Sequence, residues 1–425
     1  MQKSIPSKPA RRLPTLFAGL FFAFAACGQS YSVLDLGTPS GYTNGVGNNS
    51  VAHAINNSGS VAGEWGQNSS SERAFLYAGN TNMDLGMLAG ASFEAGYSVN
   101  ASNMVAGEAE SFVGGFYAYS YSNGSLADLT PRISGVTIPY SLAHAVNNGG
   151  VFVGESYVSS SAIHAVIFTG SQHVTDLGVL TGGNYSAAYG INNSNVIVGE
   201  STVGSGGTLA FVYSNGVMTS LGTLPGGNYS AAFAINDAGQ IAGEASSSSG
   251  QTHAVLFENG VMTDLGTLGG TNSSAAAINQ SGMIVGYAAT AAGDSHAFLY
   301  NGSAMLDLNS LISRAECTNL TSASGINDFG QIAATGYTTN GEERAFLLTP
   351  VLQLASPAMQ EGLNFQVTVR GVPGQKFILQ GSTNLAYPSS WTPIETNTLV
   401  TGSTNWMDTD VSPPPYRFYR AQVAP

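Results

Sequence analysis

A four-part pattern recurs seven times in this chain and constrains its fold more than any other feature. In the fifth copy it reads Ala-Ile-Asn at 234–236, Ile-Ala-Gly-Glu at 241–244, His-Ala-Val-Leu-Phe at 253–257 and Thr-Asp-Leu-Gly at 263–266. The Glu position follows the Asn position by eight residues, the His position follows nine later, and the Asp position eleven or twelve later. A fixed period indicates a repeat architecture built from one supersecondary unit.

The four marker positions differ in how well the copies keep their residue type. The Asn position is Asn56, Asn100, Asn147, Asn192, Asn236, Asn279 and Asn327. The Glu position is Glu64, Glu108, Glu155, Glu200, Glu244, Tyr287 and Thr335. The His position is Arg73, Tyr117, His164, Leu209, His253, His296 and Arg344. The Asp position is Asp84, Asp128, Asp176, Ser220, Asp264 and Asp307, with no seventh member in line.

Each copy predicts four short strands. Residues 231–235 and 253–257 are short apolar runs bounded by turn formers, which is the pattern of buried strands. The dipeptide Asn259-Gly260 is the strongest signal for a two-residue hairpin. Four-stranded units of about 40–45 residues are typical of propeller blades.

The count of strands predicts how the array closes. The seventh copy ends at 344–348 without the Asp-Leu-Gly string, which stands instead at 35–37, before the first copy. An N-terminal strand completing the last blade would close the ring and remove open sheet edges. A linear solenoid is the alternative, but in a linear array the N-terminal strand would have no incomplete last unit to join. We therefore expect an all-β protein with a seven-bladed β-propeller at 31–350.

Strand alternation assigns the connections to two faces. Turns after the first and third strands lie on one side, here called the turn face, and they are short. Loops after the second and fourth strands lie on the other side, the loop face. Nearly all length variation falls in the loops after the fourth strand, and variable loops on a rigid scaffold often carry function. The loop face is therefore the expected binding face.

The ends of the chain indicate export. Residues 1–26 carry Lys3, Lys8, Arg11 and Arg12 before an apolar run, which is typical of a secretory signal peptide. Cys27 partly matches a lipoprotein processing site, so an outer-surface lipoprotein with a lipid anchor is the alternative to a secreted protein. Without residues 1–26, 8 basic and 25 acidic residues remain, a charge of −17. This acidity argues against nucleic-acid partners.

Residues 351–425 do not continue the repeat. Alternating apolar residues and turn formers there predict a small β-sandwich, with Trp391 and Trp406 expected in its core.

Strings such as His-Ala-Phe, Asp-Leu-Gly-Thr-Leu-Gly-Gly and Ile-Asn-x-x-Gly-x-x-x-Gly-Glu recur in register over about residues 31–350. In these strings the chain resembles the HAF family of extracellular bacterial repeats. The resemblance implies secretion and a repeat β architecture, and it brings no reaction and no catalytic residues. The tail resembles a C-terminal module of secreted bacterial repeat proteins.

The recurring Glu, His and Asp invite a catalytic or metal-site interpretation. We expect a structural role instead, with Glu244 opposite His253 across a hairpin and Asp264 beside the same His. Cross-strand pairs of this kind contribute about 0.2–1 kcal/mol each. The first copy keeps complementary charges with Glu64 and Arg73, and Arg is not a metal ligand. No catalytic residue, metal ligand or cofactor is predicted.

The first strand of each copy offers a better candidate for ligand binding. Three residues before the Asn stand His53, Tyr97, His144 and Tyr189 in the first four copies. Strand parity directs these side chains toward the central channel or into packing between blades. They are the predicted ligand-binding residues.

Two functions fit these features. The first is a secreted or cell-surface, non-enzymatic binding or structural module with an extracellular carbohydrate or protein ligand. The alternative is a carbohydrate-active enzyme that uses carboxylates in the central pit.

Overall fold

The computed structural model describes residues 31–39, 49–66, 72–170, 173–204, 206–315, 317–360, 364–372, 375–382, 391–399, 403–408 and 418–424. The predicted signal peptide (1–26) and Cys27 lie outside this part of the chain. Within the described ranges no helix has the length and apolar character needed to cross a membrane.

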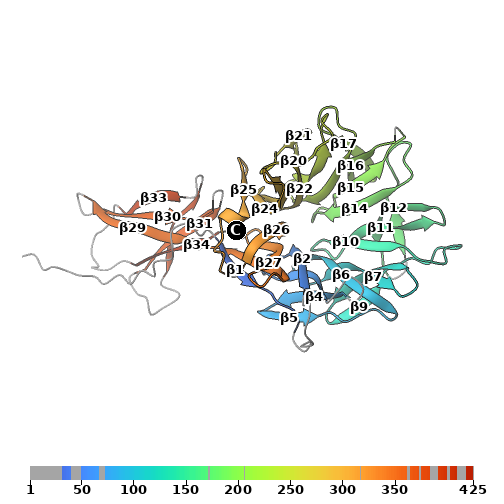
Figure 1. Cartoon of the computed structure of the whole chain (residues 1–425), viewed down its shortest axis with the longest axis horizontal. Coiled ribbons are helices and arrows are strands. Elements are labelled where there is room, and N and C mark those ends of the chain that lie inside the picture. The colour runs from blue at the N-terminus through green and yellow to red at the C-terminus, as the bar shows by residue number, and fades with distance from the viewer. Residues whose placement is uncertain are drawn as a thin grey trace, which may run out of the picture.

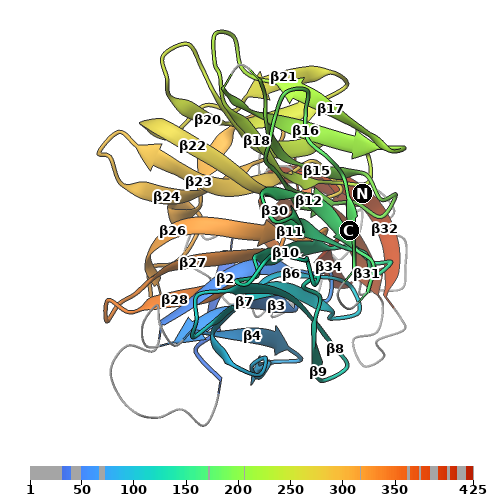
Figure 2. The same ribbon diagram turned by 90° about the vertical axis from the view of Figure 1, so that its right-hand side faces the viewer.

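Seven four-stranded antiparallel sheets surround a common axis (Figures 1 and 2). Blade one is β2 (Asn49–Ile55), β3 (Val61–Gly66), β4 (Arg73–Ala78) and β5 (Thr81–Asp84). Blade two is β6 (Ala91–Val99), β7 (Val105–Ser111), β8 (Phe116–Ser122) and β9 (Ser125–Asp128). Blade three is β10 (Ser141–Val146), β11 (Phe152–Ser159), β12 (Ala162–Phe168) and β13 (Val174–Asp176). Blade four is β14 (Ser186–Ile191), β15 (Ile197–Thr202), β16 (Thr208–Ser214) and β17 (Val217–Gly222).

The remaining blades repeat this order. Blade five is β18 (Ser230–Ile235), β19 (Ile241–Ser246), β20 (Thr252–Glu258) and β21 (Val261–Asp264). Blade six is β22 (Gly269–Ile278), β23 (Ile284–Thr290), β24 (Ser295–Tyr300) and β25 (Met305–Asp307), followed by the short helix η1 (Leu308–Ser310). Blade seven contains β26 (Cys317–Ile326), β27 (Ile332–Thr338) and β28 (Glu343–Pro350). The expected seven-bladed propeller is confirmed.

The N-terminal strand closes the ring as predicted. Strand β1 (Tyr31–Asp35) pairs antiparallel with β28, with Tyr31 opposite Pro350 and Asp35 opposite Phe346. It is the outer strand of blade seven, so the blue start of the chain lies beside the orange last blade (Figure 2). Because one blade contains both ends of the repeat, opening the ring requires breaking a strand ladder.

The glycine before each Glu allows the first two strands of a blade to pack closely. A Cβ atom added to Gly243 would lie 2.1 Å from the carbonyl oxygen of Ala231 on the first strand. Gly63 is similar, and the ring of Phe75 also covers it. Phe75, Phe211, Phe298 and Phe346 on the third strands are fully buried. The Gly-Glu string of the repeat is thus partly a packing requirement.

Serines on the first strands join neighbouring blades. Ser230 accepts a hydrogen bond from the backbone N–H of Ala210 (2.8 Å) and donates to the carbonyl of Gly222 (2.5 Å). Ser186 and Ser273 make the same pair of bonds at their own blade interfaces. These bonds satisfy buried backbone groups at the junction of two sheets.

The C-terminal module is a small sandwich beside the propeller (Figure 1). One sheet is β29 (Gln353–Gln360), β30 (Asn364–Arg370) and β33 (Ser403–Asp408), and the other is β32 (Thr392–Thr398), β31 (Lys376–Ser382) and β34 (Phe418–Val423). Trp406 packs against its buried core of Val369, Phe377, Leu379 and Leu399. The expectation for Trp391 was wrong, since that ring is only half-buried and lies 4.5 Å below the Arg420 guanidinium.

Candidate functional site: the axial pit

A closed ring of asparagines joins all seven blades around the axis. Each ring Asn donates from Nδ2 to the backbone carbonyl of the ring Asn in the next blade, at 2.8–3.2 Å. The last bond runs from Asn327 back to Asn56 over 3.0 Å. All seven side chains are buried, with 2–6% exposure.

The same asparagines also hold the turns after the first strands. The Oδ1 of Asn192 accepts from the backbone N–H groups of Ser194 (3.0 Å) and Val196 (2.9 Å). The other six repeat this pair of bonds. From the sequence these residues are expected only as turn formers. The signal for the ring was available, because Asn is the only marker that never changes.

One residue later in the chain, a second circle of polar side chains links the turns. Asp237 accepts from the backbone N–H and the Nδ2 of Asn193, both at 2.9 Å, and Asp328 accepts from the N–H of Gln280 at 2.9 Å. This amide collar comprises Asn57, Asn148, Asn193, Asp237, Gln280 and Asp328. Ala101 occupies the seventh position and interrupts it.

A β-bulge occurs three residues before the ring Asn in every blade. In blade four the pairing passes from Ala188 opposite Gly199 to Gly190 opposite Val198, so Tyr189 has no partner. The other six blades have the same irregularity. A bulge changes the direction of the side chain that it carries. The seven bulge residues are His53, Tyr97, His144, Tyr189, Phe233, Ala276 and Ser324.

Five of these residues form a continuous aromatic arc. Ring centroids are 5.2 Å apart for His53 and Tyr97, 5.9 Å for Tyr97 and His144, and 5.1 Å for His144 and Tyr189. Phe233 continues the series at 5.5 Å from Tyr189. The structure therefore brings the four predicted residues together. It adds Phe233, and the small residues of blades six and seven leave the circle open on one side.

The arc, the Asn ring and the amide collar line a pit of about 610 Å³ on the axis. The pit is bordered by the turns after the first strands, and among the described residues it touches no loop of the loop face. The expectation that the large first-strand residues serve the loop face was therefore wrong. The bulge lies only three residues from the ring Asn, so its side chain shares the pit with the turns after the first strands, while the Tyr97 and Tyr189 hydroxyls reach Glu108 and Glu200 on the second strands.

Carboxylates stand behind the arc. The hydroxyl of Tyr97 donates to Glu108 at 2.5 Å, and that of Tyr189 donates to Glu200 at 2.9 Å. His53 and His144 lie 3.5 and 3.7 Å from the corresponding carboxylates, Glu64 and Glu155.

Burial raises the pKa of both Glu108 and Glu200, and the tyrosine hydrogen bonds oppose this shift. The pKa values of Tyr97 and Tyr189 are raised chiefly by burial and then by the nearby carboxylates. Each tyrosine therefore stays protonated, and its hydroxyl donates a hydrogen bond to the carboxylate.

The pairing expected between the Glu and the third-strand His was also wrong. Glu244 stands opposite Ala254, and His253 stands opposite Ala245. The two residues occupy adjacent rungs of the ladder, so their side chains leave opposite faces of the sheet. Arg73 likewise pairs with Asp84 at 2.9 Å rather than with Glu64.

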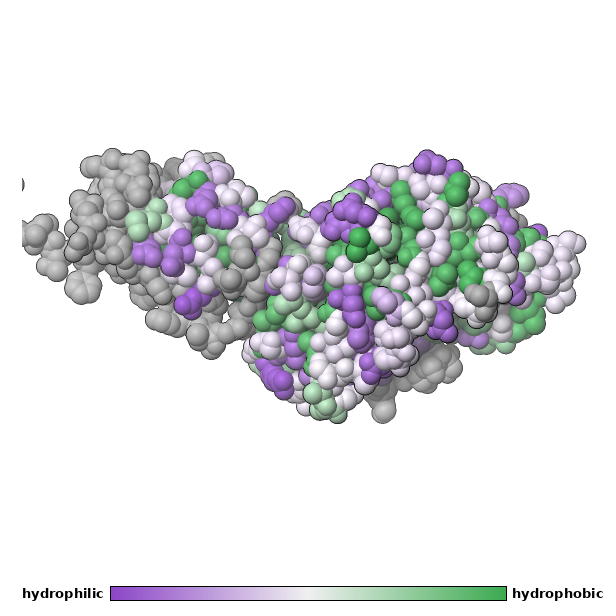
Figure 3. All heavy atoms as spheres, turned by 90° about the horizontal axis from the view of Figure 1, so that it is seen from above, coloured by the Kyte–Doolittle hydropathy of each residue, from purple (hydrophilic) through white to green (hydrophobic). Residues whose placement is uncertain are grey.

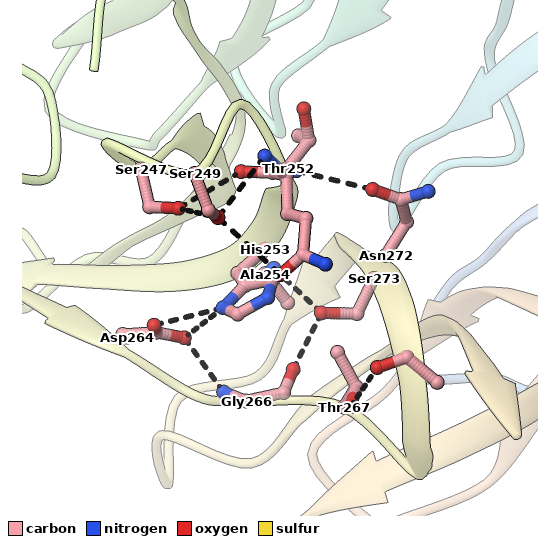
Figure 4. Close-up of polar contacts among 12 residues, drawn as sticks. Ser247, Ser249, Thr252, His253, Ala254, Asp264, Gly266, Thr267, Asn272 and Ser273 are labelled. Atoms are coloured by element: carbon pink, nitrogen blue, oxygen red, sulfur yellow. Dashed lines mark hydrogen bonds and ion pairs between the residues drawn. The ribbon is translucent and has the colours of Figure 1, made fainter. Parts of the chain in front are cut away.

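The His–Asp half of the expected arrangement is present. Nδ1 of His253 lies 2.8 Å from Asp264, whose other oxygen accepts from the Gly266 N–H, as Figure 4 shows. The nearby Ser273 hydroxyl is engaged by backbone groups of Ala254 and Gly266, which leaves it unsuited to act as a nucleophile. Across the described ranges, no three His, Cys, Asp or Glu side chains cluster as metal ligands.

Comparison by sequence finds no matching protein family and no matching curated protein. Similar solved structures include a puromycin-hydrolysing peptidase of Mycobacterium tuberculosis, with 8% identity, TM-score 0.47 and coverage of 77% of this chain and 59% of that one. A gluconolactonase from Xanthomonas campestris has 11% identity, TM-score 0.37 and coverage of 76% and 90%. A six-bladed fungal lectin from Aleuria aurantia has 10% identity, TM-score 0.31 and coverage of 83% and 96%.

Proposed function

We propose that this chain is a secreted, non-enzymatic binding module of the HAF repeat type, which holds an extracellular ligand in its axial pit. The aromatic arc carries the proposal. Seven equivalent bulges aim seven side chains at the axis, and five of them are rings in mutual contact. Concave sites lined by aromatic groups with a few polar neighbours are the usual form of small-molecule sites.

The alternative, a carbohydrate-active enzyme, needs carboxylates free to act on a substrate. The four carboxylates that contact the arc are not among the described residues that line the pit. Asp237 and Asp328 at its rim accept hydrogen bonds within the amide collar. These engagements favour binding over hydrolysis.

The visible surface of the propeller mixes polar and apolar residues. In Figure 3 pale and purple residues are interspersed with separate green patches on the propeller face that is visible. Cleavage of residues 1–26, and a lipid anchor on Cys27 as the alternative, are tested by mass spectrometry of the exported protein.

A binding screen tests the function. The purified chain is passed over a panel of polysaccharides and small molecules, and both retention and cleavage are scored. We expect retention without cleavage, lost when Tyr97 and Tyr189 are both replaced by Ala. Replacing Asn215 and Asn301, which lie in the outer turns of blades four and six, should leave retention unchanged. Cleavage of any panel member by the pure protein would favour the enzyme instead.

A further inference from the structure

We propose that the ligand group bound in the axial pit is an organic cation, a quaternary or protonated amine. The proposal rests on the binding function proposed above and names its ligand chemistry. It follows from three properties of the pit: its charge, the faces of its rings, and the state of its hydrogen-bonding groups.

Among the described residues that line the pit, the acids are Asp237 and Asp328 and the only basic side chains are His53 and His144. Asp237 and Asp328 stand at its rim, and no Lys or Arg occurs among the described residues that line it. The arginines Arg73, Arg132 and Arg344 are paired with acids elsewhere. A cationic ligand is therefore the partner that balances the local charge.

The rings of the aromatic arc contact four other carboxylates, among them Glu108 and Glu200. Cations bind over aromatic faces, and the attraction grows as the site is desolvated. The hydroxyls of Tyr97 and Tyr189 donate hydrogen bonds to Glu108 and Glu200, which makes the phenol rings richer in electrons. A cation in contact with these rings thus also lies near the Glu108 and Glu200 carboxylates that their hydroxyls bind.

The amide groups of the pit are already largely occupied. Each ring Asn donates to the next blade and accepts two backbone N–H groups, as described for Asn192. The amide collar is also bonded within itself. A neutral polyol must pair its hydroxyls to bind well, and it finds few free partners here. A weakly hydrated cation has no such requirement.

The open side of the circle gives space to the rest of such a ligand. Ala276 and Ser324 replace rings in blades six and seven, where the small residues Ala277 and Gly325 also line the pit, together with the larger Tyr287. A substituent on the cation can lie along this side while the cationic group contacts the arc.

A matched pair of ligands tests the charge directly. Choline and its neutral isostere 3,3-dimethylbutan-1-ol differ in one atom, and each is titrated calorimetrically into the full chain. We expect choline to bind about tenfold more tightly or better. Glu108→Gln keeps a hydrogen-bond acceptor for Tyr97 but removes the charge, and should weaken choline severalfold while leaving the neutral isostere unchanged. Phe112→Ala, at an 82% exposed side chain outside the pit, is the control and should change neither.

The outcomes separate this proposal from the function on which it rests. Equal binding of the two ligands would overturn the proposal that the ligand is a cation. Choline binding that survives replacement of both Tyr97 and Tyr189 by Ala would overturn it as well. If a neutral panel member is retained through the two tyrosines and choline does not bind, the cationic ligand is ruled out. The binding function is then kept. Failure of every panel member and of choline overturns both.

Discussion

The Asn ring and the aromatic arc lie three residues apart on the same strands, yet the seven blades treat them differently. The ring position is Asn in every blade, and each side chain makes the same bonds. The bulge position has one backbone geometry in every blade but carries rings in five and small residues in two. Constant side chains here hold the ring together, whereas varied side chains on a constant backbone line the proposed binding site.

The largest effect should come from opening the ring. Deleting residues 1–38 removes β1 and its ladder with β28. The exposed edge of blade seven should then promote aggregation and lower the melting temperature strongly. Light scattering and circular dichroism measure both. An equally stable monomer would contradict the closed ring.

Breaking the Asn ring at one point should cost less, but still a large fraction of stability. Asn192→Ala leaves the Asn236 carbonyl and two backbone N–H groups without their partners. We expect a loss of about 3 kcal/mol in urea denaturation. Asn193→Ala, one residue on in the exposed collar, is the matched control and should cost clearly less. Equal losses would mean that the ring has no special role.

Glu94 departs from the repeat at a buried position between blades, and its expected effect is on stability rather than on binding. It occupies the position of the joining serines Ser186 and Ser230, is 0% exposed, and its Oε1 accepts from the Leu88 N–H. Its Oε2 is buried without a hydrogen-bond partner among the described residues, and burial raises its pKa to about 7.

Because this folded-state pKa exceeds the usual 4.5, the folded state holds the proton more tightly. Stability is then complete below about pH 4.5 and is lost as pH rises through about 7. Glu94→Gln should remove this loss, on the order of 2–3 kcal/mol at pH 8. Urea midpoints at pH 5 and pH 8 measure it, and parallel profiles for the two proteins would refute the assignment.

The smallest effect should follow from changing a third-strand His. His253→Leu loses the pair with Asp264, a cross-strand contact worth about 1 kcal/mol or less. Leu209 already occupies the equivalent place in blade four. Thermal melting should shift little and retention on the panel should be unchanged. Loss of retention would give this pair a role in binding.

Period, strand count and the displaced Asp-Leu-Gly string were enough to predict the propeller and its closure, because these features depend on sequence spacing alone. The bulge was not predictable in this way. It moves one residue out of register, so parity indicated that Tyr97 and Tyr189 face the axis but not which turns they share the pit with. The Glu244–His253 error has the same origin, since a difference of one rung reverses the side of the sheet.

The most direct test measures stability and binding side by side in two variants, Asn192→Ala and the double variant Tyr97→Ala with Tyr189→Ala. We predict that the Asn variant melts several degrees lower and, while folded, keeps its retention on the ligand panel. The tyrosine variant should lose retention and melt close to the unaltered protein. If both variants lose stability and binding together, the ring and the arc are not separate in function, and the account is wrong.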